Sequence, residues 1–468
     1  MKKFVAKFLP ILLICAVILN VVTVTATEAE LAVYAEDISD SADISYDGNT
    51  IKISSEKEFC GVYIEWSELP GSWSLYDGES EIPYGEKGFL HEYAELKTGG
   101  KYAEIRRSKD VSAKNIYVFT EGTLPEWVQV WDEPCEKADL MLCSTHADDE
   151  QLFFLGVLPY YAGELGLSVQ VVYFVNHNDS DSRPHELLNG LWTVGVRNYP
   201  VIGDAPDAWS ESLEEGLTNF ADSGFSEDEL VDFQVEMIRR FKPLIVVGHD
   251  INGEYSHGQH MVNTHTLRKA LEISNNPDEY SDSADEYGVW DVPKTYLHLY
   301  EENQINIDWD IPLEKFGGKT AYEVSLEGFK CHESQHWTWF SKWIGLKSDW
   351  GVTKAADIED YSPCKYGLYR STVGEDVEKK NFLENITLYK DQEIAQPEES
   401  VMPSGTPENL QPENAPDGSD VPNDGESDNL LYEADKKSDI MLIVLCVAVL
   451  ATACCMIVIL IKRIKNSD

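Results

Sequence analysis

Residues 138–150 read ADLMLCSTHADDE, an apolar run that stops abruptly at a cluster of charged side chains. The run ADLMLCST is typical of a β-strand that is buried on both faces of a sheet. The segment that follows, QLFFLGVLPYYAGELG (151–166), predicts a helix, which Pro159 must kink or end. Strand, polar turn and helix in this order indicate one unit of an α/β fold. The charged cluster therefore lies where the strand meets the helix.

The same alternation continues along the chain. Buried strands are predicted at SVQVVYFVN (168–176), YPVIGD (199–204) and PLIVVGHD (243–250), and helices at HELLNGLWTVGV (185–196) and SEDELVDFQVEMIRRF (226–241). Ser226 and Glu229 are spaced as a capping box. Continuous apolar strands between helices predict a parallel sheet covered on both faces, a Rossmann-like three-layer α/β/α domain. No GxGxxG motif follows the first strand, so a dinucleotide is not indicated.

A different pattern precedes this domain. Residues 32–134 contain short alternating segments such as TIKIS, GVYIEW, YAEIRR and NIYVFT, separated by the turn signals YDGN, LPGS and KTGG. This pattern predicts a small β-sandwich domain. Its aromatic side chains are more often core than ligand contacts, although stacking on sugars is the alternative; they include Trp66, Trp73, Tyr76, Trp127 and Trp131.

Both ends of the chain predict a position at a membrane. Residues 1–26 carry lysines, an apolar stretch and small residues in the order of a secretory signal peptide. Residues 440–461 are uncharged and about as long as a membrane-spanning helix, and the basic tail 462–468 follows. Positive residues stay on the cytoplasmic side, so the domains between the two segments are expected outside the cell. The acidic, proline-rich stretch 391–439 predicts a disordered linker between the second domain, 136–390, and the membrane.

Composition narrows the function. The chain has 83 acidic and 37 basic residues, a formal net charge of -46, which disfavours nucleic acid as a partner. Five of the nine cysteines lie between the two apolar ends, an odd number that cannot all pair within one chain. A disulfide between Cys331 and Cys364 is one option that spacing alone does not establish. No CxxC motif indicates a thiolate zinc site.

Two polar clusters follow buried strands of the predicted sheet. His146, Asp148 and Asp149 come after the first strand, and His257 and His260 come after PLIVVGHD. Acidic residues also stabilise helix N-termini, but that explanation does not account for the histidines. Ligands of open α/β sheets bind beyond the carboxyl ends of the strands, where both clusters lie.

Imidazoles together with a carboxylate are typical of an open zinc site whose remaining position is left to water. Bound zinc activates water for hydrolysis, and a carboxylate that does not bind the metal can accept the proton. Consecutive side chains on a tight turn point in different directions. Adjacent aspartates can therefore divide these two roles, one as ligand and one as base.

The pair HADDE and GEYSHGQH resembles motifs of the LmbE-like, or PIG-L, zinc deacetylases, which read close to AHPDDE and GHPDH. That family removes acetyl from N-acetylglucosamine linked to another group. The resemblance extends over about residues 138–388 and includes RPHELLNGLWTVGV, CHESQH and YGLYRSTVGED. It implies a zinc-dependent N-deacetylase acting on an acetylamino sugar or glycan.

The resemblance also implies roles for individual residues. His146, Asp149 and His260 correspond to the zinc ligands, and Asp148 to the general base. His257 corresponds to the histidine that polarises the amide carbonyl and later protonates the leaving amine. The substrate-binding residues would be Tyr255, near the carbonyl oxygen, and Arg183, for which a surface salt bridge is an equally good explanation.

The sequence departs from the family motifs at three positions. Ala147 stands where the family has proline, and Gly258 and Gln259 replace Pro-Asp between the two histidines. The missing aspartate removes a charge that would help keep His257 protonated. Two other functions remain open: a different metal-dependent amide hydrolase, and a surface glycan-binding protein without turnover. The presence of Asp148 argues against the latter, because a structural metal site has no use for a second aspartate.

Overall fold

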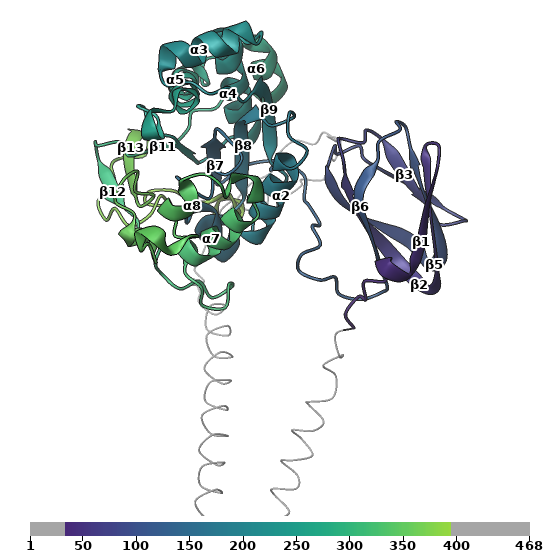
Figure 1. Cartoon of the computed structure of the whole chain (residues 1–468). Helices are drawn as coiled ribbons and strands as arrows, with labels where there is room; N and C mark the ends of the chain where they lie inside the picture. The colour runs from purple at the N-terminus through teal and green to yellow at the C-terminus, as the bar shows by residue number, and fades with distance from the viewer. Residues whose placement is uncertain (1–32, 395–468) are drawn as a thin grey trace, which may run out of the picture. The chain divides into compact units, whose positions relative to one another are not determined.

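The computed structural model describes residues 33–394 (Figure 1). The predicted signal peptide, membrane helix and tail lie outside these residues, as does the predicted linker apart from its first four residues. Those four belong to helix α9 (Tyr389–Ile394), which continues past the predicted boundary at residue 390. Within residues 33–394, every helix is too short or too polar to cross a membrane.

Residues 140–371, within the predicted second domain, contain a seven-stranded sheet in the order β12-β13-β11-β10-β7-β8-β9. Strands β7 to β11 run parallel to one another, whereas β13 is antiparallel to both β11 and β12. The strand bounds are β7 Leu140–Ser144, β8 Val169–Asn176, β9 Val201–Pro206, β10 Ile245–Gly248, β11 Lys294–His298, β12 Gln304–Asn306 and β13 Lys365–Ser371. The first four confirm the strands predicted from the sequence.

Helices cover both faces of this sheet because alternate side chains of each strand point to opposite sides. On β7, Leu140 and Leu142 belong to the core that also holds Leu187 of α2, while Met141 belongs to a separate core with Val235 of α4. Figure 1 shows α3 to α6 on one side and α2 and α7 on the other. The helix bounds are α2 Arg183–Thr193, α3 Leu213–Asp222, α4 Glu227–Phe241, α5 Gly258–Ile273, α6 Ser281–Tyr287, α7 Ala321–Lys330 and α8 Phe340–Trp343. The predicted mixed α/β fold is confirmed, and so is the capping box of α4.

The order of the strands places the site. Chain order runs outward from β7 to β9 on one side, and then returns to β10 and β11 on the other side of β7. The connections that leave β7 and β10 therefore diverge, and open α/β sheets bind their ligands at the carboxyl ends of such a pair of strands. Both polar clusters identified in the sequence follow β7 and β10.

Only part of the helix predicted over 151–166 is present: residues 157–164 are helical, and residues 151–156 are not. The chain forms successive turns after β7 and then a π-helical turn, η2 (Pro159–Glu164). Gly156 has a φ of 85°, which is incompatible with a right-handed helix, and the indole of Trp309 packs against it so closely that a Cβ would lie 2.3 Å away. Pro159 then lacks the N–H that would continue the helical hydrogen bonds.

The strands of residues 42–119, within the predicted first domain, form a sheet, but the predicted β-sandwich domain is not confirmed. The sheet is antiparallel, and its strands are β1 Ala42–Asp47, β2 Thr50–Trp66, β3 Trp73–Tyr76, β4 Glu81–Tyr84, β5 His91–Arg107 and β6 Ala113–Phe119. The predicted turn KTGG lies inside β5, opposite an irregular stretch of β2 where the register shifts near Phe59. Trp66, Trp73 and Trp131 are buried, as expected for core residues, whereas Trp127 is 45% exposed.

The five cysteines of the described residues are all free, so Cys331 and Cys364 form no disulfide. Cys135, Cys143 and Cys364 are buried, and burial raises the pKa of each of these thiols to between about 11 and about 12. A thiol with a raised pKa holds little thiolate at neutral pH and is a poor nucleophile. These side chains act as small apolar groups in the core.

Candidate metal centre and active site

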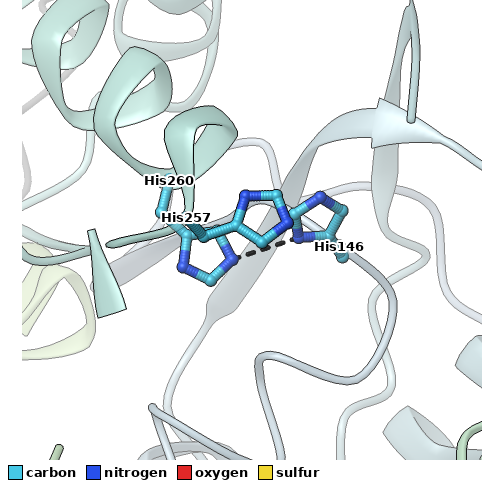
Figure 2. A group of neighbouring side chains, drawn as sticks. All are labelled: His146, His257 and His260. Atoms are coloured by element: carbon cyan, nitrogen blue, oxygen red, sulfur yellow. Dashed lines mark hydrogen bonds between the residues drawn. The ribbon is translucent and has the colours of Figure 1, made fainter. Parts of the chain in front are cut away.

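Three predicted ligands from two loops converge on one point. His146 and Asp149 lie in the turn after β7, and His260 lies in the first turn of α5, which follows β10. His146 Nδ1 is 3.1 Å from Asp149 Oδ2 and 3.1 Å from His260 Nε2, and His260 Nε2 is 3.2 Å from Asp149 Oδ2. The dashed line in Figure 2 joins the two histidine nitrogens.

This geometry fits a zinc ion. Ligand atoms that share a tetrahedral Zn²⁺ at about 2.1 Å lie roughly 3.4 Å from one another, close to the spacing found here. All three side chains are buried, so no bulk water competes for the lone pairs. Three protein ligands leave one position of a tetrahedron free for water or substrate, the arrangement of catalytic zinc sites.

Hydrogen bonds on the far side of each ring direct the lone pairs to that point. His260 Nδ1 donates a hydrogen bond to Glu254 Oε2 over 2.7 Å, so the lone pair of the neutral ring is on Nε2. His146 Nε2 donates to Gln259 Oε1 over 2.9 Å, which leaves the lone pair on Nδ1. Gln259 is held in this orientation because its amide N–H donates to the Pro206 carbonyl. Such outer partners fix the tautomer and the orientation of metal-binding histidines.

Two nearby histidines are less suited to bind a metal, although their nitrogens also lie near those of the ligand set. His249 Nε2 accepts the Thr145 N–H over 3.0 Å, and His257 Nδ1 accepts the Gln259 N–H over 3.2 Å. A ring nitrogen that already accepts a hydrogen bond has no lone pair to offer, and the other nitrogen of a neutral imidazole carries the proton. The ligand set with free lone pairs is therefore His146, Asp149 and His260.

The charges of the ligand set favour a cation. Burial opposes the charge of Asp149, yet His260 and His146 lower the pKa of its carboxyl well below the usual range. Burial likewise opposes protonation of His260, but Asp149 and Glu254 raise its pKa to about 9. Without metal, protons therefore supply the positive charge that these buried carboxylates require.

Glu254, which the sequence analysis did not single out, holds three imidazoles. Its carboxylate lies 2.7 Å from His260 Nδ1, 2.9 Å from His249 Nδ1 and 2.6 Å from His298 Nδ1. Burial opposes its charge, but His249 and the other two histidines lower its pKa well below the usual range. Glu254 thus links the loop after β10 to the end of β11. Glu254 lies within the motif GEYSHGQH, but the family resemblance assigned no role to it.

Asp148 has the strained backbone of the turn, with a φ of 126°. Its N–H donates to Glu150 Oε2 over 2.9 Å, and Glu150 also pairs with His332 over 3.0 Å. Burial raises the pKa of the Asp148 carboxyl to about 7, although the Arg183 guanidinium, 3.7 Å away, opposes the rise. A carboxyl with a pKa near the working pH is well suited to accept and return a proton.

His257 lies beside the ligand set, as Figure 2 shows. Its ring stacks on that of His260 with 4.6 Å between centroids and lies 4.7 Å from that of His146. Burial, followed by the charges of these two rings, lowers the pKa of His257 to about 2. Because Nδ1 accepts the Gln259 N–H, the neutral ring carries its proton on Nε2 and can donate a hydrogen bond from there.

Arg183 and Tyr255, the two predicted substrate-binding residues, also reach the site. Arg183 donates to the Ala147 carbonyl over 2.7 Å and forms an ion pair with Asp207 over 3.3 Å, in which both side chains are mostly buried. Tyr255 has a left-handed backbone, with a φ of 45°, and its ring contacts the rings of His257 and His260. Both positions remain predictions as substrate contacts.

The departures from the family motifs have local structural reasons. Ala147 and Gly258 stand where the family has proline, and both use the backbone N–H that proline lacks. Ala147 N–H donates to His177 Nε2 over 3.0 Å, and Gly258 N–H donates to the Ser210 carbonyl over 2.8 Å. Gln259 replaces an aspartate, and Asp207 places a carboxylate 3.5 Å from the same nitrogen of His146 that Gln259 contacts.

No family model matches the chain. The chain is similar to the 1D-myo-inositol 2-acetamido-2-deoxy-alpha-D-glucopyranoside deacetylase of Mycobacterium leprae, with 29% identity over 35% of this chain and 61% of that protein. It is also similar to the enzymes of that name from Catenulispora acidiphila, at 25% identity over 36% of this chain and 58% of the relative, and from Mycolicibacterium gilvum, at 27% over 42% and 72%. The chain thus spans about three-fifths of the first two relatives. Their names confirm the expected similarity to sugar N-deacetylases.

Two solved structures are similar over a comparable part of the chain. One is the N,N'-diacetylchitobiose deacetylase of Pyrococcus horikoshii, with 15% identity over 50% of this chain and 85% of that chain, at a TM-score of 0.35. The other is teicoplanin deacetylase Orf2, with 14% identity over 42% and 84%, at a TM-score of 0.27. TM-scores this low do not establish a common fold.

Proposed function

We propose that the chain is a zinc-dependent N-deacetylase that hydrolyses the acetamido group of an amino sugar to acetate and a free amine. One observation carries this proposal: His146, Asp149 and His260 aim free lone pairs at one buried point, and Asp148, a carboxylate outside that set, lies on the same turn. The similarity to deacetylases of an acetamido sugar supports the choice of substrate class.

His146, Asp149 and His260 would hold the ion, which when bound supplies a Lewis acid that activates water and polarises the amide. Asp148 accepts the proton of the attacking water. Its raised pKa and its contact with Arg183 suit a group that takes up a proton and then gives it away. The positive charge of Arg183 stabilises the ionised form of the Asp148 carboxylate.

His257 serves as a hydrogen-bond donor to the amide carbonyl. Its Nε2 carries the proton because Nδ1 accepts the Gln259 N–H, so the neutral ring can stabilise negative charge that develops on the carbonyl oxygen. Burial and two neighbouring histidines lower the pKa of His257, so this residue rarely carries a second proton that it could give to the amine. We therefore assign the proton that the leaving amine needs to Asp148, which received one from water, and not to His257 as the family resemblance implies.

We further propose that the enzyme acts outside the cytoplasm, as a membrane-tethered ectodomain. The arrangement of residues 1–26 and the uncharged segment 440–461 with its basic flank support this location. The acidic linker 391–439 would separate the catalytic domain from the bilayer. Substrates at that position are acetylated glycans of the cell envelope or its surroundings.

Two other functions have less support. A glycan-binding protein without turnover has no need of Asp148, whose strained backbone costs roughly 1–3 kcal/mol. A metal-dependent hydrolase of another amide would use the same residues, and only the similarity to sugar deacetylases speaks against it.

Acetate release from a panel of acetylated amino sugars, and from acetylated peptides and polyamines as comparison substrates, tests the proposal. We expect turnover of one or more of the sugars, its loss after treatment with a chelator, and its recovery when zinc is added. Release from the peptides or polyamines alone would favour the other hydrolase. Binding of the sugars without release from any substrate would favour the glycan-binding protein.

A further inference from the structure

Exposed tryptophans lie beside the candidate site. Within residues 33–394, five tryptophans have more than a third of their surface exposed, and four of these belong to the second domain. Three of them connect to the site through ring contacts and are called the tryptophan platform: Trp209, 58% exposed, Trp339, 38% exposed, and Trp350, 55% exposed. Single exposed apolar side chains are ordinary, but a connected group marks a binding surface.

The platform continues directly from the residues beside the ligand set. Trp209, in the loop between β9 and α3, lies edge to face on His257 with 4.6 Å between ring centroids and stacks on Tyr255 at 6.0 Å. The ring of Trp339, next to α8, also contacts Tyr255, edge to face, with 6.0 Å between the ring centroids. Tyr255 therefore joins two exposed indoles that come from separate loops.

Trp350 extends the platform away from the site. Its ring stacks on that of Trp339 at 6.1 Å, with 28° between the planes. Each step from Tyr255 to Trp339 and from Trp339 to Trp350 is comparable with the length of one sugar residue. The broad faces of pyranose rings carry C–H groups that pack on indole rings, and indoles keep a rigid shape at little cost in entropy.

From these contacts we propose that the tryptophan platform binds the neighbouring sugar residues of an oligosaccharide or polysaccharide, so that the enzyme acts on an acetylamino sugar within a chain. This inference rests on the proposed function, which it deepens. The net charge of -46 favours an uncharged glycan over one that carries phosphate or carboxylate groups. A lone monosaccharide would reach Tyr255 but not Trp350.

The test compares acetate release by the full-length protein from N-acetylglucosamine oligomers between the disaccharide and the hexasaccharide. We expect kcat/KM to rise with chain length. Trp350→Ala should lower the ratio of kcat/KM for the hexasaccharide to that for the disaccharide by about tenfold, the effect of one lost stacking contact, and Trp350→Tyr should restore most of it. Trp127→Ala, which removes an exposed indole of the first domain, should leave the ratio unchanged.

A second measurement keeps this inference separate from the proposed function. Calorimetric titration of the full-length Asp148→Asn variant with the hexasaccharide should show binding that weakens when Trp350→Ala is added. Binding of this kind without acetate release by the wild type would sustain the platform and reject the deacetylase. A ratio that is independent of chain length, or equal losses on the short and long substrates, would overturn the platform. So would platform variants that change adsorption to lipid vesicles and not glycan binding.

Discussion

Asp148 and Asp149 are chemically identical neighbours that the fold treats differently. Two imidazoles keep Asp149 ionised, whereas burial raises the pKa of Asp148 to about 7 against the opposing charge of Arg183. Asp148 has a φ of 126°, and such strain is common where function requires it. The two carboxylates have different partners, Arg183 for Asp148 and two histidines for Asp149, which is consistent with the division of roles expected from adjacent aspartates.

His257 is the second residue whose role depends on its neighbours. If it donates a hydrogen bond to the carbonyl, His257→Gln should keep the bound metal and lower kcat by about 10²–10³-fold, the usual loss when one oxyanion donor is removed. Measuring metal content and acetate release on the same sample checks this expectation. Loss of metal in His257→Gln would instead make His257 a ligand.

The pH dependence of stability should reveal the protonated ligand set of the metal-free protein. The folded pKa of His260 is about 9, above the value of roughly 6.5 in an unfolded chain, so its contribution to stability is complete below pH 6.5. That contribution is lost as the pH rises through about 9. Urea unfolding of chelator-treated protein should therefore show falling stability between these two values. The zinc-loaded protein, whose His260 is already deprotonated, should lack this fall, and identical curves for the two forms would count against the site.

At the scale of elements, the site depends on where β7 and β10 end. Their carboxyl ends lie side by side, so a turn after one and a helix start after the other place His146 and His260 within hydrogen-bond distance although 114 residues separate them. Strand order is a property of the whole sheet. Local sequence patterns predict that each polar cluster ends a strand, but not that β7 and β10 are neighbours.

Glu254 joins these elements and gives a prediction at this scale. Glu254→Gln should weaken metal binding by about 10–100-fold, because the outer carboxylate that orients His260 becomes a neutral amide. Competition with a chelator of known affinity measures this change. Glu227→Gln, at an exposed carboxylate paired with Lys269, is the matched control and should leave metal affinity unchanged. Equal affinity in both variants would show that Glu254 serves the fold alone.

Across the whole molecule, the sequence predicted the strands better than the connections. Strands β7 to β10 were predicted from apolar runs because a strand buried on both faces has few alternatives. The first part of the helix predicted over 151–166 is absent because local patterns do not show the contact of Gly156 with Trp309, far along the chain. The ligand triad was predicted from motifs, whereas Glu254 and Asp207 were missed because their roles depend on tertiary contacts.

The sequence also predicts that the catalytic domain lies outside the cell, and this prediction concerns the entire chain. If residues 1–26 direct export and residues 440–461 anchor the protein, protease added to intact cells should digest the domains between them. An antibody against the catalytic domain would follow the digestion, with a cytoplasmic protein as the control for intact membranes. Protection until lysis would place the domain inside the cell.

The most direct test of the central claim compares Asp148→Asn with Asp149→Asn for zinc content and acetate release in parallel. Asparagine tolerates the positive φ of residue 148, so the turn should keep its shape. Asp148→Asn should retain zinc and lose about 10²–10⁴-fold in turnover, since only the base is gone. Asp149→Asn should lose zinc itself, because a neutral amide is a poorer ligand for a dication. Equal zinc loss in both variants, or undiminished turnover in Asp148→Asn, would contradict the assignment of one aspartate to the metal and the other to the proton.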